Sequence, residues 1–221
     1  MYQHKVVYHF YMTIDSIKSG SDPDLQRIEL SDGSLFSFKI CYLPPFFFED
    51  SRYVPGTEIS TDEADAFRFA AACLRAEKAA LGLVARAEQC VFGLSRKLEK
   101  GRHQVACVRA VITRLTELEI VDDRRFARLW LQSRINRRAD TPRKLLTGLR
   151  SRGIDRDAAA QALKSALHLE AEKALLDRYI AKNRLLEGEL GAADRSSLKF
   201  RLKQEGFSLS LIQRFWEDYD L

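Results

Sequence analysis

The segment GLRSRGIDRDAAAQAL, residues 148–163, decides the fold because its pattern occurs three times in the chain. A basic, leucine-bearing helical run is followed by a glycine and then by a second run with apolar residues at helical spacing. The other copies are KLEKGRHQVACVRAVI at 97–112 and RLKQEGFSLSLIQRFW at 201–216. The junction glycines are Gly101, Gly153 and Gly206, and longer helical runs precede them at about 62–87, 123–138 and 170–186. This spacing predicts three tandem three-helix repeats that stack their apolar faces on one another.

Residues that start and stop helices occur at the right places in the middle copy. Pro142 follows Thr141 and fits the first helical position, where the missing N–H costs nothing. Gly153 fits a left-handed helix C-cap, and Asp155 can cap the helix that follows. These signals predict two short helices joined by a glycine turn.

Residues 1–59 have a different texture, which predicts a small β unit before the repeats. The run HKVVYHFYMTI is rich in β-branched and aromatic residues, and Asp32-Gly33 is a hairpin turn signal. Apolar and polar residues alternate over Phe36–Ile40, as in a half-buried strand. Phe46–Phe48 either dock a partner or pack inside the protein, and packing is favoured. A capping box at Ser60–Glu63 then begins the helical part.

We therefore predict a mainly α protein, a solenoid-like helical array preceded by a small β unit. A β-rich domain covers residues 1–59, and three-helix repeats cover 60–121, 122–168 and 169–221. With 221 residues and 46% hydrophobic side chains, the chain is long enough to bury a substantial core.

Positive charge is concentrated in the second repeat. Residues 122–168 carry 12 basic and 5 acidic side chains, a net +7, whereas the whole chain carries a net +5. The net charge is −3 over 1–60, +2 over 61–121 and −1 over 169–221. Ten of the twelve cations are arginines, whose guanidinium groups pair bidentately with phosphate or carboxylate. This asymmetry favours a polyanionic partner, and a solvated helical face is the alternative.

The helical periodicity predicts which side chains of the second repeat face its core. The inward residues should be Phe126, Leu129, Trp130, Leu145, Leu146 and Leu149. The basic faces of the two helices should merge into one surface. Trp130 and Trp216 either stack on bases or pack in the core, and packing is favoured. The candidate binding residues are Arg124, Arg125, Arg128, Arg134, Arg137, Arg138, Arg143, Lys144, Arg150 and Arg152.

The sequence carries no signature of catalysis or of membrane insertion. A GxxxxGK loop, an HExxH pair and a GxSxG elbow are all missing, and the four histidines stand far apart. Asp122-Asp123 fits helix capping better than a metal site. The cysteines form no CxxC pair and are predicted to be reduced thiols, three of them buried. We expect a cytosolic protein that is not an enzyme and needs no metal or cofactor.

Three segments resemble the RecX family of recombinase regulators. VDDRRFARLWLQSR is similar to the family's Asp-Asp-x-x-Phe-Ala start, PRKLLTGLRSRGID to its Arg-rich helix pair, and LKFRLKQEGFS to its Lys/Arg-Gly-Ile/Phe junction. SDGSLFSFKI and YVPGTEIS also resemble the lead segment of some members. The resemblance covers most of the chain and is strongest over 120–156. The first repeat departs from it by one missing residue between Leu98 and Gly101.

The resemblance implies an elongated, slightly curved helical module that binds the RecA recombinase filament on single-stranded DNA. It implies suppression of the filament's ATPase, strand-exchange and coprotease activities, hence a role in DNA recombination, DNA repair and the SOS response. We expect a monomer whose basic repeat faces the DNA backbone or an acidic recombinase surface, without base preference. The alternative is a helix-turn-helix-like DNA-binding regulator, built on the helix pair of 141–167, which should prefer a particular duplex and dimerise.

Overall fold

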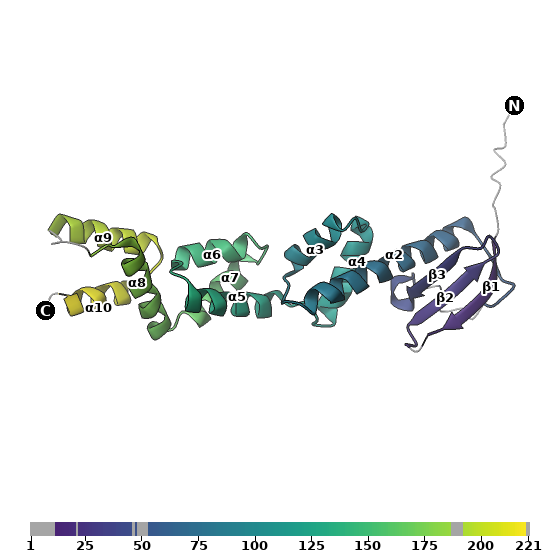
Figure 1. The fold of residues 1–221 in the computed structure, drawn as a ribbon, viewed down its shortest axis with the longest axis horizontal. Coiled ribbons are helices and arrows are strands. Elements are labelled where there is room, and N and C mark those ends of the chain that lie inside the picture. Colours follow the sequence, from purple (N-terminus) through teal and green to yellow (C-terminus); the bar gives the residue numbers. More distant parts are fainter. Residues whose placement is uncertain (1–11, 21, 46, 48–52, 187–191, 220–221) are drawn as a thin grey trace, which may run out of the picture. The chain divides into compact units, whose positions relative to one another are not determined.

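Over the residues that the structure describes, the fold is mainly helical with a small antiparallel sheet near its N-terminal end (Figure 1). The computed structural model describes residues 12–20, 22–45, 47, 53–186 and 192–219. The chain packs as two compact units: one combines the chain up to Ala87 with Leu94–Ile120, and the other combines Glu88–Gly93 with the chain from Val121 onward. The mainly α fold with an N-terminal β unit is confirmed. The elongated, curved shape and the domain boundaries at 60, 122 and 169 stay predictions.

The sheet of the first unit has the strand order β3-β2-β1-β4, and all neighbouring strands are antiparallel. The predicted hairpin at Asp32-Gly33 joins β2 to β3. Gly33 has a φ of 81°, a left-handed conformation that glycine adopts without steric penalty. The predicted alternation leaves Phe38 of β3 buried and Ser37 exposed. The strands are β1 Met12–Ser19, β2 Leu25–Leu30, β3 Leu35–Lys39 and β4 Glu58–Ile59.

Aromatic side chains join the sheet to helix α2 (Thr61–Val84). Phe67 of α2 stacks on Phe38 of β3 with ring centroids 5.3 Å apart, and Phe47 meets Phe67 edge-on at 5.4 Å. Phe47 is buried, so its predicted packing is confirmed, while Phe46 and Phe48 lie outside the described residues. These rings form the core between the sheet and the helix.

The remaining helices of the first unit follow α2 in the chain. The capping box predicted at Ser60–Glu63 is present, because the Ser60 hydroxyl accepts from the Glu63 N–H and the Glu63 carboxylate accepts from the Ser60 N–H. The helices after α2 are α3 Val91–Lys100, whose first turn belongs to the second unit, and α4 Val105–Glu117.

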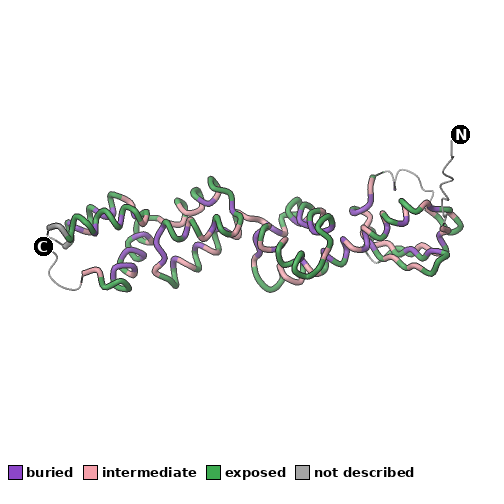
Figure 2. Tube along the Cα trace, turned by 90° about the horizontal axis from the view of Figure 1, so that it is seen from above, coloured by how far each residue is buried: buried purple, intermediate pink, exposed green. Residues whose placement is uncertain are grey.

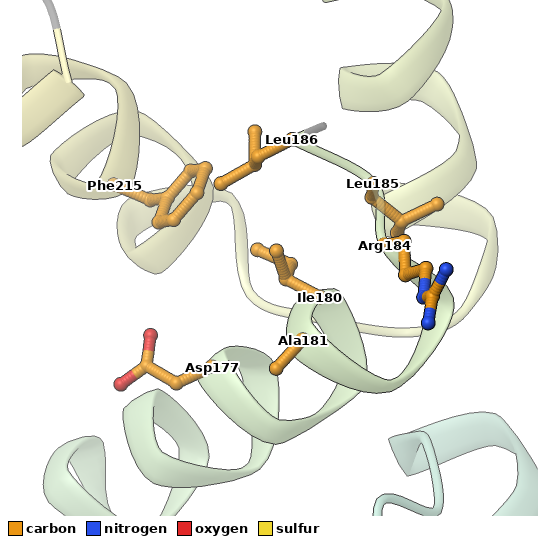
Figure 3. Close-up of a pocket in the computed structure, with 7 residues that line it drawn as sticks. All are labelled: Asp177, Ile180, Ala181, Arg184, Leu185, Leu186 and Phe215. Atoms are coloured by element: carbon orange, nitrogen blue, oxygen red, sulfur yellow. The ribbon is translucent and has the colours of Figure 1, made fainter. Parts of the chain in front are cut away.

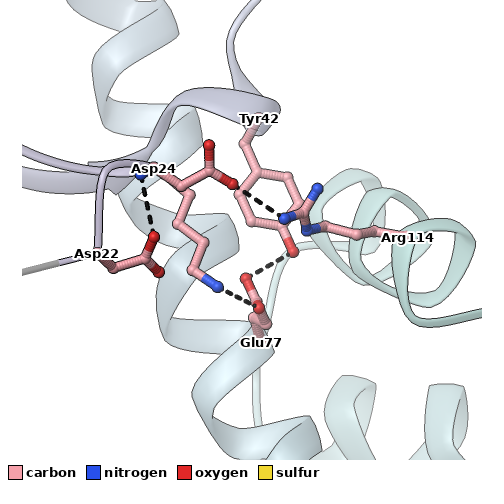
Figure 4. A network of polar contacts seen from close by, with 6 residues as sticks. Asp22, Asp24, Tyr42, Glu77 and Arg114 are labelled. Carbon is pink, nitrogen blue, oxygen red and sulfur yellow. Dashed lines mark hydrogen bonds and ion pairs between the residues drawn. The ribbon is translucent and has the colours of Figure 1, made fainter. Parts of the chain in front are cut away.

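A polar network around the Glu77 carboxylate ties the β unit to α2 and α4 (Figure 4). Glu77 is only 3% exposed and accepts hydrogen bonds from Lys39 Nζ at 2.8 Å and Tyr42 Oη at 2.9 Å. Arg114 of α4 lies over the Tyr42 ring and pairs with Asp24 at 3.1 Å. Burial and the hydrogen bond to Glu77 raise the pKa of the Tyr42 hydroxyl, so this group stays protonated and remains a donor.

The second unit contains the helices of the middle and C-terminal repeats. They enclose a hydrophobic cluster that includes Leu131, Leu145, Leu175 and Leu202. Buried and exposed segments alternate along each helix in Figure 2, as expected for helices with one apolar face. The helices are α5 Asp123–Arg137, α6 Pro142–Arg150, α7 Arg156–Ala166, α8 Leu169–Asn183, α9 Ala192–Gln204 and α10 Leu209–Tyr219.

The predicted helix caps of the middle repeat are confirmed. Thr141 accepts from the Lys144 N–H, with Pro142 in the first helical position of α6. Asp122 and Asp155 cap α5 and α7 through their carboxylates. The interpretation of Asp122 as a cap rather than a metal ligand is consistent with these contacts.

The two later junction glycines, Gly153 and Gly206, are required by a close approach as well as by their backbone angles. Gly153 has a φ of 78°, and a Cβ added to it would lie 2.5 Å from Cβ of Phe92 in the first turn of α3. Gly206 has a φ of 89°, and a Cβ there would lie 3.3 Å from Arg143 N and Pro142 Cβ in the first turn of α6. The same arrangement therefore occurs twice: each glycine turn packs against the first turn of the preceding repeat's middle helix.

The assignment of Gly101 as the equivalent of these glycines was wrong. The left-handed residue of the first junction is Arg102, with a φ of 62°. A hydrogen bond from His103 N to Leu98 O closes this turn. The missing residue between Leu98 and Gly101 moves the left-handed position one place along the chain. Arg102 is exposed, so its side chain can point away from the protein.

Polar contacts reinforce the junction between α6 and the turn that precedes α10. Thr141 Oγ1 donates to Glu205 Oε2 at 2.6 Å, and Arg143 N donates to Glu205 O at 2.9 Å. The second contact pairs the Arg143 N–H in the first turn of α6 with the Glu205 carbonyl just after α9, two places where helices leave backbone groups unpaired. Among the cysteines, Cys73, Cys90 and Cys107 are buried free thiols and Cys41 is an exposed one, as predicted.

Candidate interaction surface

Six of the ten candidate cations are exposed and make no ion pair within the described part of the chain. An exposed arginine without a carboxylate partner keeps its charge available for an incoming anion. Arg143 and Arg150 project from α6, whose opposite face buries Leu145 and Leu149, as the periodicity predicted. The six are Arg124, Arg128, Arg137, Arg138, Arg143 and Arg150.

The other four cations already have partners in the protein. Arg125 Nε pairs with Glu88 Oε1 at 2.8 Å. Arg152 donates to the Gly148 carbonyl at 2.7 Å from a half-buried position. Arg134 and Lys144 both contact one carboxylate, that of Asp140. These four contribute to the fold directly, so their charge is less available to a partner.

Asp140 is a buried carboxylate held between candidate cations. Its side chain is 7% exposed and pairs with Lys144 Nζ at 2.9 Å and Arg134 Nη1 at 3.2 Å. Burial raises the pKa of this carboxyl, but the hydrogen bond from Lys144 and the charges of Lys144, Arg134 and Arg138 outweigh burial. The pKa of Asp140 therefore lies below its ordinary value. The ionised carboxylate offsets part of the positive charge at the end of α5.

Two of the candidate arginines lie close to the Trp130 ring. The guanidinium carbons of Arg134 and Arg152 lie 5.1 and 4.8 Å from the indole ring centroid. A Cβ added to Gly148 would lie 2.6 Å from the ring, so α6 approaches the indole closely. Trp130 is half-buried and Trp216 is buried, which agrees with the packing interpretation of both residues. The arginines that cover Trp130 are cation–π partners.

The cations of α5 do not share one face, and one predicted core residue is wrong. Leu129 is 43% exposed, whereas Ala127 and Leu131 are buried. The small Ala127 marks the core side of α5, because an alanine lets a neighbouring helix approach closely. On this corrected wheel, Arg128 and Arg134 flank Leu131 on opposite sides. The merging of the α5 and α6 basic faces stays a prediction.

A groove beside α5 was missed by the sequence analysis. Arg124 and Arg128 line it from α5, and Ala162, Ser165 and Ala166 line it from α7. A small apolar residue gives no sign in the sequence of whether it faces a core or a groove. The one sign available in the sequence is that Ala158, Ala162 and Ala166 recur at every fourth residue, which places them on one face of α7.

A separate pocket of about 370 Å³ lies in the C-terminal repeat, between α8 and α10 (Figure 3). Five of its seven lining residues are apolar, with Ile180, Leu185 and Phe215 among them. Asp177 and Arg184 add one charge of each sign. Because these two charges balance, the pocket has no net positive charge and does not extend the basic surface.

Within the described residues, no group of three or more His, Cys, Asp or Glu side chains could hold a metal ion. His168 is instead the N-cap of α8, where its Nδ1 accepts from the Ala171 N–H at 3.2 Å. His4 and His9 lie outside the described residues. No described helix is both long and apolar enough to cross a membrane.

Comparisons with known proteins agree on one family. The profile of the second three-helix domain of RecX matches residues 122–163. The regulatory protein RecX of Treponema pallidum, strain Nichols, is 32% identical over 159 residues, which cover 72% of this chain and 94% of that protein. The regulatory protein RecX of Thermobifida fusca is 32% identical over 63% of this chain and 76% of that protein.

Solved structures support the fold independently. A crystal structure of regulatory protein RecX matches with a TM-score of 0.66 and 20% identity, over 91% of this chain and 97% of that chain. The crystal structure of RecX from Lactobacillus salivarius matches with a TM-score of 0.55 and 18% identity, over 67% of this chain and 97% of that chain. The arrangement of sheet and helices described above is therefore one that solved proteins adopt.

Proposed function

Because this chain belongs to the RecX family of regulatory proteins, we propose that it binds the RecA nucleoprotein filament and inhibits its ATPase, strand-exchange and coprotease activities. The observation that carries the proposal is the relationship to RecX proteins along most of the chain, including the arginine-rich middle repeat. The protein is a cytoplasmic monomer that regulates homologous recombination and DNA repair without catalysing a reaction. It needs no metal or cofactor.

The exposed arginines of the middle repeat supply the contacts to the filament. Arg143 and Arg150 lie two turns apart on the exposed side of α6, so one helix presents two charges in a row. Arg124 and Arg128 lie one turn apart on α5. Phosphates of the bound strand and carboxylates of the recombinase are both suitable partners, because a guanidinium pairs bidentately with either group. Neutralised phosphates release counterions, which favours binding at low salt.

The test replaces Arg124, Arg128, Arg143 and Arg150 with glutamate. Inhibition of RecA-dependent ATP hydrolysis on single-stranded DNA should weaken by at least about tenfold, because each reversal removes an attraction of up to about 1 kcal/mol and adds repulsion. The matched control reverses four exposed cations of the C-terminal repeat, Lys173, Lys182, Lys203 and Arg214. The control changes the net charge equally and should alter inhibition by less than about threefold.

Two results would reject the proposal in different ways. If the parent protein leaves ATP hydrolysis and strand exchange unchanged, it does not inhibit the recombinase. If it also prefers one duplex sequence and dimerises, the helix-turn-helix alternative is supported. Equal effects of the two sets of reversals would show that the middle repeat has no special role. Circular dichroism checks that every variant keeps its helicity.

A further inference from the structure

A continuous groove runs between α5 and α7 and reaches the start of α8. Two hollows of about 360 and 560 Å³ lie along these helices. Both are lined by Arg128, Ser165 and Ala166, so they are two parts of one groove. We call it the α5–α7 groove.

The walls of the α5–α7 groove differ in chemistry. Arg124 and Arg128 contribute long cationic side chains, one helical turn apart on α5. The wall from α7 contributes Ala158, Ala162 and Ala166, at successive turns of that helix. Alanine side chains let an incoming backbone approach closely, as they do where two helices cross. Because α7 has 11 residues, the groove has room for about three turns of a helix.

The charge of the groove is positive on balance. Arg124 and Arg128 make no ion pair with a described residue. Arg178 adds a third cation, whose guanidinium donates to the main-chain carbonyls of Ile135 and Asn136 and meets no carboxylate there. Glu170 is the carboxylate among the lining residues. Three cations against one anion favour an acidic occupant.

We propose that the α5–α7 groove binds a short acidic helix of a partner protein. Carboxylates of that helix pair with Arg124 and Arg128, and its small or apolar side chains pack against the alanines of α7. Nucleic acid is a poorer fit, because the lining residues include no Phe, Tyr or Trp side chain on which a base could stack. This inference rests on the proposed function in one respect: the partner that carries the acidic helix is the recombinase or a protein bound to it.

The first test uses the full chain and a fluorescent 18-residue peptide as the probe. The peptide is helical, with glutamates along one edge and alanines and leucines on the adjoining face. Fluorescence anisotropy measures its binding to the parent and to two double variants. Arg124→Glu with Arg128→Glu should weaken binding by at least about tenfold. Arg143→Glu with Arg150→Glu, which has the same net charge but lies on α6 outside the groove, should weaken it by less than about threefold.

A steric variant separates the groove from general electrostatics. Ser165 is exposed and lines both hollows, so Ser165→Phe fills the groove without entering the hydrophobic core. It should weaken peptide binding as much as the charge reversal does, although it leaves the net charge unchanged. Ser151→Phe, at an exposed position just after α6, is the matched control and should leave binding unchanged.

Each outcome decides the inference. Failure of the parent to bind the peptide, equal loss in the two double variants, or full binding by Ser165→Phe would each overturn it. A 25-nucleotide oligo(dT) is titrated in parallel. If the groove variants lose oligo(dT) binding and keep peptide binding, the occupant is nucleic acid and the inference is wrong. RecA inhibition is measured on the same proteins, so failure of the proposed function is seen separately from failure of the groove.

Discussion

At the scale of single residues, the turn glycines limit which substitutions the protein tolerates. Gly153→Ala should lower the free energy of unfolding of the second unit by about 2–4 kcal/mol, because left-handed backbone costs about 1–2 kcal/mol and the contact with Phe92 costs more. Both tryptophans, Trp130 and Trp216, lie in the second unit. Denaturant unfolding followed by tryptophan fluorescence therefore reports on this unit directly.

Two other turn residues serve as comparisons. Gly206→Ala should cost less than Gly153→Ala, because its neighbours lie at 3.3 Å rather than 2.5 Å. Arg102→Gly should leave the stability of the first unit unchanged or raise it slightly, since glycine removes the left-handed penalty and increases the entropy of the unfolded chain. A Gly153→Ala protein as stable as the parent would show that α3 is not packed against this turn.

Asp140 should make the stability of the second unit depend on acid pH. Its pKa is lowered in the folded protein, so its contribution to stability is complete above its ordinary value of 3.8 and is lost as the pH falls through the lower folded value. Asp140→Asn should therefore be less stable than the parent by a constant amount between about pH 6 and 8. The difference should narrow as the pH falls below about 4. Urea unfolding at each pH, followed by tryptophan fluorescence, measures both curves. A difference that stays constant down to about pH 2.5 would contradict the ion-pair assignment.

At the scale of elements, the Glu77 network holds the β unit to its helices. Glu77→Gln should lower the free energy of unfolding of the first unit by about 1–3 kcal/mol. This loss is smaller than for a fully buried ion pair, because the Lys39 side chain is 20% exposed and water screens its charge. Hydrogen exchange of peptides from β3 and α2 should accelerate, while peptides from α8 and α10 should not change. Adding Lys39→Met should recover part of the loss, since it removes the cation left without a partner. No recovery would indicate that the Tyr42 hydrogen bond carries most of the effect.

Helix positions and caps could be predicted from the sequence because they depend on local signals. As caps, Thr141-Pro142, Asp155 and Gly153 act within one turn of where they stand, so their capping roles could be predicted from neighbouring residues alone. The contact of Gly153 with Phe92 and that of Thr141 with Glu205 could not. Leu129 was placed wrongly because the core side of α5 is defined by a small residue, Ala127, that carries little hydrophobic signal. In such a case only the neighbouring helix shows which side of the helix is buried.

The candidate surface could be predicted in composition but not in arrangement. The excess of arginine in 122–168 is visible in the sequence, and seven of the ten candidate residues are exposed, six of them without an ion pair to a described residue. The sequence does not show that Asp140 forms ion pairs with Arg134 and Lys144, because the turn between α5 and α6 brings these three side chains together. It also does not show the α5–α7 groove, which exists only where two helices pack.

At the scale of the whole molecule, the uneven charge along the chain should make inhibition sensitive to salt. The concentration of protein needed for half inhibition of RecA should rise with ionic strength. The expected slope is about 0.7 in log–log form for each phosphate of a single strand that is contacted. The variant with Arg124, Arg128, Arg143 and Arg150 reversed should show a flatter slope. An unchanged slope would mean that these arginines contact protein carboxylates rather than phosphates.

Gly153 and Gly206 each pack against the first turn of the middle helix of the preceding repeat. This packing has a consequence for how such a chain can be lengthened. A duplicate of residues 122–168 spliced after position 168 would bring its own glycine to the Pro142-Arg143 step of the original, and would offer its own Pro142-Arg143 step to Gly206. Both new joints would repeat one that already exists. A repeat cannot be added in the same way before the first one, because the left-handed residue of the first junction is Arg102. Its side chain would stand where such a joint needs a glycine. Growth by gene duplication is therefore expected on the C-terminal side of the first repeat, and designers can add units there.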